Sequence, residues 1–255
     1  MIRIKTKEDI AILREGGKRH AEIMRKVAIT IRPGISTKDI DDVIFQMIKE
    51  GGDKPAILNY TPYGAKRPYP ASSCISINDE VVHGIPNENP KILKEGDIVG
   101  IDFALKHKGM VTDMAITVPV GNISEELEFF LRNTKSALMA GIKSAKGGKR
   151  IGDIGSAIEL VGIANNYGIV EDLAGHGVGY SVHEEPFVPN YGNPGQGEKL
   201  KPGMVIAIEP MFNLGSRYIS LDKDGYTYRT KDGKASAHFE HTVLITKGDA
   251  EILTA

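Results

Sequence analysis

The chain has 255 residues, 41% of them hydrophobic and 25% charged, and a net charge of −1. This composition is typical of a soluble globular protein with a substantial core, and the single cysteine, Cys74, excludes an internal disulfide framework. The charge carries no signature for nucleic acid, no apolar run reaches the length of a membrane span, and the N-terminus has no signal-peptide pattern. We therefore expect a cytoplasmic protein with no membrane partner.

Two amphipathic helices are predicted in the first fifty residues. The segment Thr6-Lys7-Glu8-Asp9 is a capping-box start, and apolar residues follow at helical spacing until Arg32-Pro33-Gly34. A second helix begins at Ser36-Thr37-Lys38-Asp39 and ends at Gly51-Gly52. His20, on the first helix, is interpreted as a packed or surface residue rather than a functional one.

An irregular loop and a series of strands are predicted after these helices. Residues 53–71 are rich in proline and tyrosine without a clear period, which predicts a long loop, and such loops are often functional. Further strands are expected at 74–78, 81–86, 204–210 and 239–246, and helices from about Ser124 and Ile151. Residues 189–199 read as a second loop.

The centre of the chain, residues 96–118, is predicted to be a β-hairpin. A turn centred between His107 and Lys108 places Asp102 opposite Asp113, with their Cβ atoms about 5 Å apart. Two carboxylates at this distance repel each other, and apolar neighbours add a cost of desolvation. A pair of divalent ions about 3.5–4 Å apart would suit them. The hairpin alone leaves open an ordinary edge hairpin with one solvated and one capping aspartate.

A weak internal repeat relates the two halves of the chain. Residues 94–102 and 201–209 share the pattern Lys-x-Gly-x-apolar-apolar-x-Ile-acid, and Val82-His83-x-x-Pro86 recurs as Val182-His183-x-x-Pro186. We infer two related αβ halves that face each other across a pseudo-twofold axis, with a boundary near Gly121.

The repeat predicts that four acidic residues converge. Asp102 and Glu209 end matching strands, and Asp113 and Glu240 lie on the next strong strand of each half. Four buried carboxylates at one seam are untenable without metal. Carboxylates with one imidazole suit Mn²⁺, Fe²⁺, Co²⁺ or Zn²⁺. Spacing leaves the imidazole open among three histidines that lie beside glycine or at a strand end: His83, His176 and His183.

At these residues the sequence resembles the type I methionine aminopeptidases over essentially the whole chain. The resemblance is carried by Cys74-Ile-Ser-Ile-Asn78, Val82-His-Gly-Ile-Pro86, Gly96-Asp-Ile-Val99 with Ile101-Asp102, Gly175-His-Gly177 with His183-Glu-Glu-Pro186, Ile208-Glu-Pro-Met211 and Glu240-His-Thr242. It implies one catalytic domain over residues 1–255 with the α+β pita-bread fold. In that fold two pseudo-symmetric halves, about 1–120 and 121–255, form a central curved antiparallel sheet with helices outside.

The resemblance also implies a dinuclear metal site. Its ligands would be Asp102, Asp113, His176, Glu209 and Glu240, with Asp113 and Glu240 bridging two divalent ions, either Co, Mn, Fe or Zn. The implied activity is removal of the initiator methionine from nascent proteins when the second residue is small. The chain looks like the short bacterial form, and we expect a monomer with at most a transient ribosome contact.

The implied mechanism uses a metal-activated water that attacks the first peptide bond. Glu209 would accept its proton, and His183 would donate to the scissile carbonyl oxygen. His83 would contact the leaving amide nitrogen. Both histidines are therefore expected to contact substrate as well as to act in catalysis.

The substrate pocket is where this chain departs from the family pattern. Val182 stands where bacterial members often have Phe, and Tyr226 follows Lys223-Asp224-Gly225 where Trp is usual. The loop 59–71 is longer than usual. Its tyrosines Tyr60, Tyr63 and Tyr69 are candidates to line the pocket, and Cys74 is expected near it.

Two other functions fit the sequence less well. An Xaa-Pro peptidase or creatinase-type hydrolase would share the fold, but His-Gly-Ile-Pro at 83–86 and the lack of a large additional N-terminal domain argue against it. A non-catalytic peptide-binding relative should have lost ligands, yet all five are present.

Overall fold

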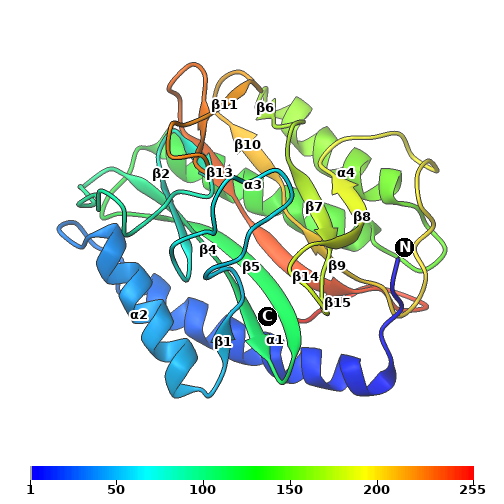
Figure 1. Cartoon of the computed structure of the whole chain (residues 1–255). Helices are drawn as coiled ribbons and strands as arrows, with labels where there is room; N and C mark the ends of the chain where they lie inside the picture. Colours follow the sequence, from blue (N-terminus) through cyan, green and yellow to red (C-terminus); the bar gives the residue numbers. More distant parts are fainter. Residues whose placement is uncertain (1) are drawn as a thin grey trace.

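The computed structural model describes residues 2–255 as four long helices and a set of mostly antiparallel strands (Figure 1). The helices are α1 (Lys7–Ala28), α2 (Thr37–Glu50), α3 (Glu125–Ser144) and α4 (Ile151–Ala164). The strands are β1 (Lys54–Pro55), β2 (Cys74–Ile77), β3 (Glu80–Val82), β4 (Ile98–His107), β5 (Met110–Pro119), β6 (Gly168–Ile169), β7 (Ala174–Gly177), β8 (Glu184–Pro189), β9 (Val205–Ile208), β10 (Met211–Asn213), β11 (Ile219–Leu221), β12 (Tyr228–Thr230), β13 (Ser236–His238), β14 (Glu240–Leu244) and β15 (Glu251–Ile252).

The first two helices begin as their sequences predict. Thr6 caps α1 and Ser36 caps α2, each through a complete capping box with the aspartate three residues later. His20 is fully buried in α1, where its Nδ1 lies 3.0 Å from the Thr112 hydroxyl. The interpretation of His20 as a packed residue is confirmed.

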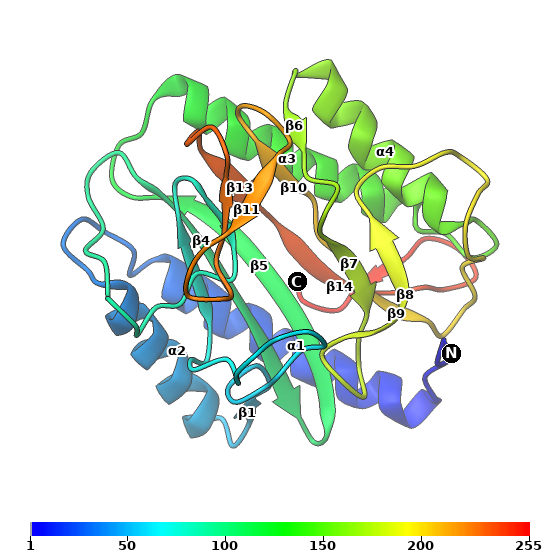
Figure 2. The same cartoon turned by 45° about the horizontal axis from the view of Figure 1, so that its top comes forward.

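One nine-stranded sheet joins the two parts of the chain (Figure 2). Its main path runs β1-β4-β5-β14-β9-β7-β8, and β2 and β15 pair with β4 and β14. The strands β4 and β9 lie on opposite sides of the central β5–β14 pair, as the sequence repeat predicts. Two small three-stranded sheets, β13-β10-β6 and β11-β12-β3, lie beside it.

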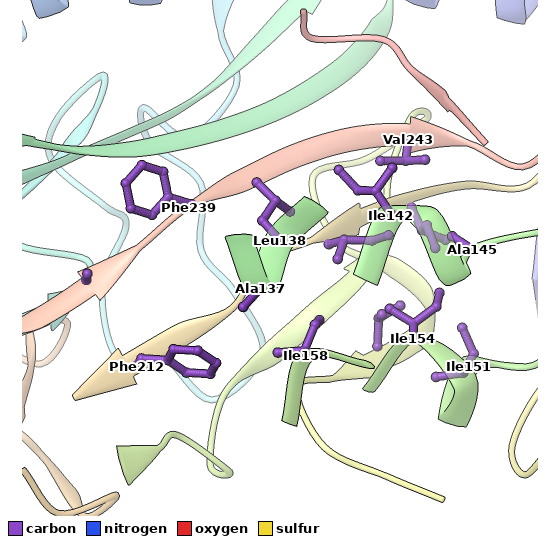
Figure 3. Close-up of a cluster of buried hydrophobic side chains, with 14 of the residues drawn as sticks. Ala137, Leu138, Ile142, Ala145, Ile151, Ile154, Ile158, Phe212, Phe239 and Val243 are labelled. Atoms are coloured by element: carbon purple, nitrogen blue, oxygen red, sulfur yellow. The ribbon is translucent and has the colours of Figure 1, made fainter. Parts of the chain in front are cut away.

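Two hydrophobic layers attach the helices to this sheet. One packs α1 and α2 onto β2, β4 and β5 through residues such as Ile40, Ile44 and Phe103. The other packs α3 and α4 onto β9 and β14, with Leu138 and Ile158 at its centre (Figure 3). Each half of the sheet is therefore held by its own pair of helices.

The central hairpin has a different register from the predicted one. Asp102 pairs with Ala115, and Asp113 pairs with Ala104, so the two acids are diagonal rather than directly opposite. The cause is the turn, since Lys108 and Gly109 both have positive φ (45° and 91°) and form a two-residue connection. The register of β4 and β5 differs from the predicted register by two residues. Because side chains alternate between the two faces of a strand, both acids still lie on the same face of the sheet.

Candidate metal centre

The pairing of strands brings the acids together on one face of the large sheet. Cys74 on β2 pairs with Asp102 on β4, Asp102 pairs with Ala115 on β5, and Ala115 pairs with Glu240 on β14. Directly paired residues of neighbouring strands point to the same face. The short Ala115 side chain therefore separates two carboxylates that approach it from either side, and Asp113 lies two residues further along the same face.

Three of the expected ligands form a compact group. One ligand atom each from Asp113, His176 and Glu240 lies within 4.8 Å of the others. The backbone of Asp113 is fixed by Thr242 on β14, whose hydroxyl accepts from the Asp113 N–H and donates to its carbonyl, each at 2.7 Å. The β5–β14 pair thus holds the position of both carboxylates.

His176 presents its Nε2 atom to this group. Its Nδ1 lies 2.9 Å from the Gly177 carbonyl oxygen, so Nδ1 carries the proton and Nε2 keeps its lone pair. Nε2 lies 3.4 Å from Oε1 of Glu209, which follows β9. Glu209 and Asp102 line the same cavity as the group of three.

The electrostatics of the site fit a divalent cation. Burial, together with the neighbouring carboxylates, raises the pKa of Asp102, Asp113 and Glu240, and burial raises that of Glu209. Burial also lowers the pKa of His176 to about 3, so the ring is neutral and able to bind a metal. The Oε1 atom of Glu240 is buried and has no hydrogen-bond partner within residues 2–255. Oxygen donors with one imidazole are a set that Mn²⁺, Fe²⁺, Co²⁺ and Zn²⁺ accept.

A cavity of about 630 Å³ opens onto these ligands. His83 and His183 both line it, and His183 stacks edge to face on His176 with ring centroids 4.5 Å apart. The Nδ1 atom of His183 lies 3.1 Å from the Tyr60 hydroxyl. His83 adopts a positive φ of 59°, a conformation that is uncommon for residues other than glycine and is often found at functional sites. The pKa values of both histidines are lowered by burial.

The expected pocket residues come from two apolar clusters, Val182 from one and Tyr69, Cys74 and Tyr226 from the other. Tyr69, Cys74, Val182 and Tyr226 are buried and line the cavity. The Tyr69 and Tyr226 rings meet at 82° with centroids 5.0 Å apart, and the Tyr226 hydroxyl donates to the carbonyl of Arg67. The expectation for Tyr63 is wrong, because that ring is fully exposed to solvent. Burial raises the pKa of the Cys74 thiol well above its usual range, which disfavours the reactive thiolate.

Sequence reasoning missed one residue of the site, His238. Its Nε2 lies 3.5 Å from Oε2 of Glu209, and its backbone is held by the Thr117 hydroxyl. The ring is 4% exposed, lines the cavity, and its Nε2 has no hydrogen-bond partner in the described part of the chain. A signal was present, since His238 and Glu240 are two positions apart in extended chain and so share a face.

Comparisons with known proteins show the family to which the chain belongs. The model of metallopeptidase family M24 matches residues 11–247. Methionine aminopeptidase 1 of Bacillus subtilis (strain 168) is 42% identical over 254 residues, which cover 100% of this chain and 99% of the relative. The crystal structure of a methionine aminopeptidase from Thermotoga maritima is 40% identical, with a TM-score of 0.94 and coverage of 100% and 99%.

A more distant structure shares the fold alone. The prolidase from Pyrococcus furiosus is 24% identical with a TM-score of 0.76, and the match covers 99% of this chain but 65% of the prolidase. Together these likenesses confirm the expected pita-bread fold. None of the helices in residues 2–255 is both long and apolar enough to cross a membrane.

Proposed function

Since the chain belongs to metallopeptidase family M24 and, within it, to the methionine aminopeptidases, we propose that it removes the N-terminal methionine from polypeptides with a small second residue. The observation that carries this proposal is the convergence of buried carboxylates and one neutral imidazole at the floor of a single cavity. The enzyme is a metal-dependent hydrolase. We expect it to act as a monomer on nascent chains, with at most a transient ribosome contact.

Asp102, Asp113, His176, Glu209 and Glu240 are the proposed ligands of two divalent ions. Asp113 and Glu240 would each help to hold both ions; they lie close to His176, and the β5–β14 pair fixes their positions. When bound, divalent ions lower the pKa of a coordinated water and so supply a nucleophile at neutral pH. Co, Mn, Fe and Zn all suit the donor set.

The remaining steps belong to side chains of this chain. Glu209 accepts a proton as general base, and Nε2 of His238 lies 3.5 Å from its second carboxylate oxygen. His183 donates a hydrogen bond to the scissile carbonyl oxygen, where negative charge develops. His83 contacts the leaving amide nitrogen. The apolar lining that Tyr69, Cys74, Val182 and Tyr226 give the cavity takes the methionine side chain.

Peptide cleavage after chelation and metal replacement tests the proposal. We expect Met-Ala-Ser to be cleaved after its first residue, no turnover in a strong chelator, and recovery when Co²⁺, Mn²⁺, Fe²⁺ or Zn²⁺ is added back singly. Turnover that persists in the chelator would contradict the metal mechanism. Preferential cleavage of Ala-Pro-Pro would instead favour the Xaa-Pro peptidase reading.

A further inference from the structure

The turn that carries His183 is held by Glu184, which lines the cavity, and by Lys5, which does not. Residues 178–183 connect β7 to β8, and two of them, Val182 and His183, line the cavity. The backbone of this turn is bonded to the hairpin, where the Val111 N–H donates to the Gly179 carbonyl at 2.6 Å. The same turn also packs against the segment that precedes α1, through Lys5.

Lys5 is the central residue of the contact between the turn and the segment that precedes α1. Its side chain is 1% exposed, and its Nζ lies 2.7 Å from Oε2 of Glu184, which is 6% exposed. A Cβ atom on Gly179, which has a φ of 139°, would lie 2.4 Å from the Cε atom of Lys5. The turn backbone is therefore packed directly on the lysine stem, and only glycine permits this approach.

Glu184 links the lysine to the turn itself. While Oε2 accepts from Lys5, Oε1 accepts from the backbone N–H groups of Tyr180 and Ser181 at 2.5 Å and 3.0 Å. One carboxylate thus binds both the ammonium group and the start of the turn. Because Glu184 directly follows His183, this carboxylate joins the end of the turn that carries the histidine to the start of the turn at Tyr180 and Ser181.

Tyr180 adds a second tie between the same two segments. Its hydroxyl donates to Oδ2 of Asp9 at 2.5 Å, and its ring lies 4.8 Å from Nζ of Lys5. Asp9 also completes the capping box of α1, and the Lys5 N–H donates to the Gly203 carbonyl just before β9. The residues before α1 are therefore fixed at both ends and are rigid enough to hold the turn.

We propose that Lys5 is a positioning residue for His183, acting through its buried ion pair with Glu184 and its packing against Gly179. The inference rests on the proposed role of His183 as donor to the scissile carbonyl. Lys5 itself touches no substrate. Its effect is to fix the turn so that the histidine ring meets the carbonyl oxygen at hydrogen-bond distance, where a small displacement costs rate.

The test is a double-mutant cycle between Lys5 and His183, measured on the metal-loaded enzyme with Met-Ala-Ser. We expect Lys5→Met to lower kcat about tenfold with little change in KM, and His183→Ala to lower it by about 10²–10³. In the His183→Ala background, Lys5→Met should change kcat by less than about twofold, because residues that act as one unit are not additive. Bound metal per chain should equal that of the wild type in all three variants.

Matched variants control for stability and for the unpaired carboxylate. Lys7→Met makes the same chemical change at an exposed lysine two residues away and should leave kcat unchanged. The double variant Lys5→Met/Glu184→Gln leaves no buried unpaired charge, so it should fold, yet it lacks the tether and should show the same loss of kcat.

Three outcomes would overturn the inference. One is a wild-type kcat in Lys5→Met/Glu184→Gln together with a low kcat in His183→Ala. That result would remove the role of Lys5 and leave the proposed function intact. Another is an equal loss of kcat from Lys5→Met in the wild type and in His183→Ala, which would show that Lys5 does not act through His183. The third is a wild-type rate in His183→Ala itself, which would remove the proposed role of His183 and this inference with it.

Discussion

Asp113 and Glu240 are the carboxylates whose loss should be most damaging. We expect Asp113→Ala or Glu240→Ala to lower kcat below detection at limiting metal, because each is proposed to hold both ions and its removal leaves the site over-cationic. Activity and bound metal per chain are the measurements. Asp249→Ala, at an exposed carboxylate, is the control and should match the wild type. A bridging variant with the wild-type rate at limiting metal would refute the assignment.

Val182 and Tyr226 should set how strictly methionine is preferred. Val182→Phe/Tyr226→Trp adds apolar contact area and removes the hydrogen bond from Tyr226 to the Arg67 carbonyl. We expect this variant to prefer methionine over leucine at least about tenfold more strongly than the wild type, since one methylene of fit gives about 1–3 kcal/mol.

The comparison of kcat/KM for Met-, norleucine- and Leu-Ala-Ser peptides measures this preference. Tyr218→Trp, at an exposed tyrosine, is the matched control. If the double variant discriminates no better than the wild type, these two positions do not shape the pocket.

The sequence predicts the acids of the site better than its histidines. Carboxylates at the ends of apolar strands are conspicuous, because burial without a cation would be so costly. His238 was missed because the last strand was expected to begin at Phe239. In the structure the chain passes at that residue from β13 in a small sheet to β14 in the large one, so the strand expected from Phe239 did not include His238 although the two-residue spacing to Glu240 indicates a shared face.

At the scale of elements, helix ends were predictable and strand register was not. The capping boxes at Thr6 and Ser36 are local, so a few residues determine them. The hairpin register depends on which two residues form the turn, and a turn at His107-Lys108 competes with one at Lys108-Gly109. A turn with positive φ at both central positions favours the pair that contains glycine. The pairing in the structure therefore differs from the predicted pairing by two residues.

The contact of α1 with the hairpin should be sensitive to acid. Burial lowers the pKa of His20 to about 3, below its unfolded value of about 6.5, so the folded protein requires the neutral ring. Above pH 6.5 the ring is neutral in the unfolded chain too, so the low pKa of His20 does not reduce the free energy of unfolding. As the pH falls from 6.5 toward 3, the unfolded chain gains a proton that the folded protein does not, and stability falls by about 1.4 kcal/mol per pH unit.

Denaturant unfolding of the metal-free protein at pH 7.0 and 5.0 tests this dependence in the wild type and in His20→Gln. We expect the variant to be less stable at pH 7.0, because it loses the packing on Phe103, but to lose about 2 kcal/mol less on acidification. The same loss in both proteins would show that His20 is not the group responsible.

At the scale of the whole molecule, bound metal should stabilise the fold. The proposed ligands come from both halves of the chain, so ions bound by them would connect strands that meet mainly along the β5–β14 pair. At a metal concentration about 100 times Kd, binding adds about 2.7 kcal/mol, which for a chain of this size is a rise in Tm of about 5–10 °C. Thermal unfolding in a chelator and after metal replacement measures it. Asp113→Ala should show no such rise, and an equal rise there would place the binding elsewhere.

The order of strands also determines when the site can exist during synthesis. Asp102 and Asp113 leave the ribosomal exit tunnel long before Glu240, which lies on β14, the later strand of the central β5–β14 pair. Until that strand is added, β5 has a free edge and the acids of the first half have no partners from the second. A growing chain therefore passes through a long interval in which it is folded in part but cannot yet assemble its metal centre. We therefore expect catalytic competence to appear only once β14 has joined the sheet, rather than to increase steadily with chain length.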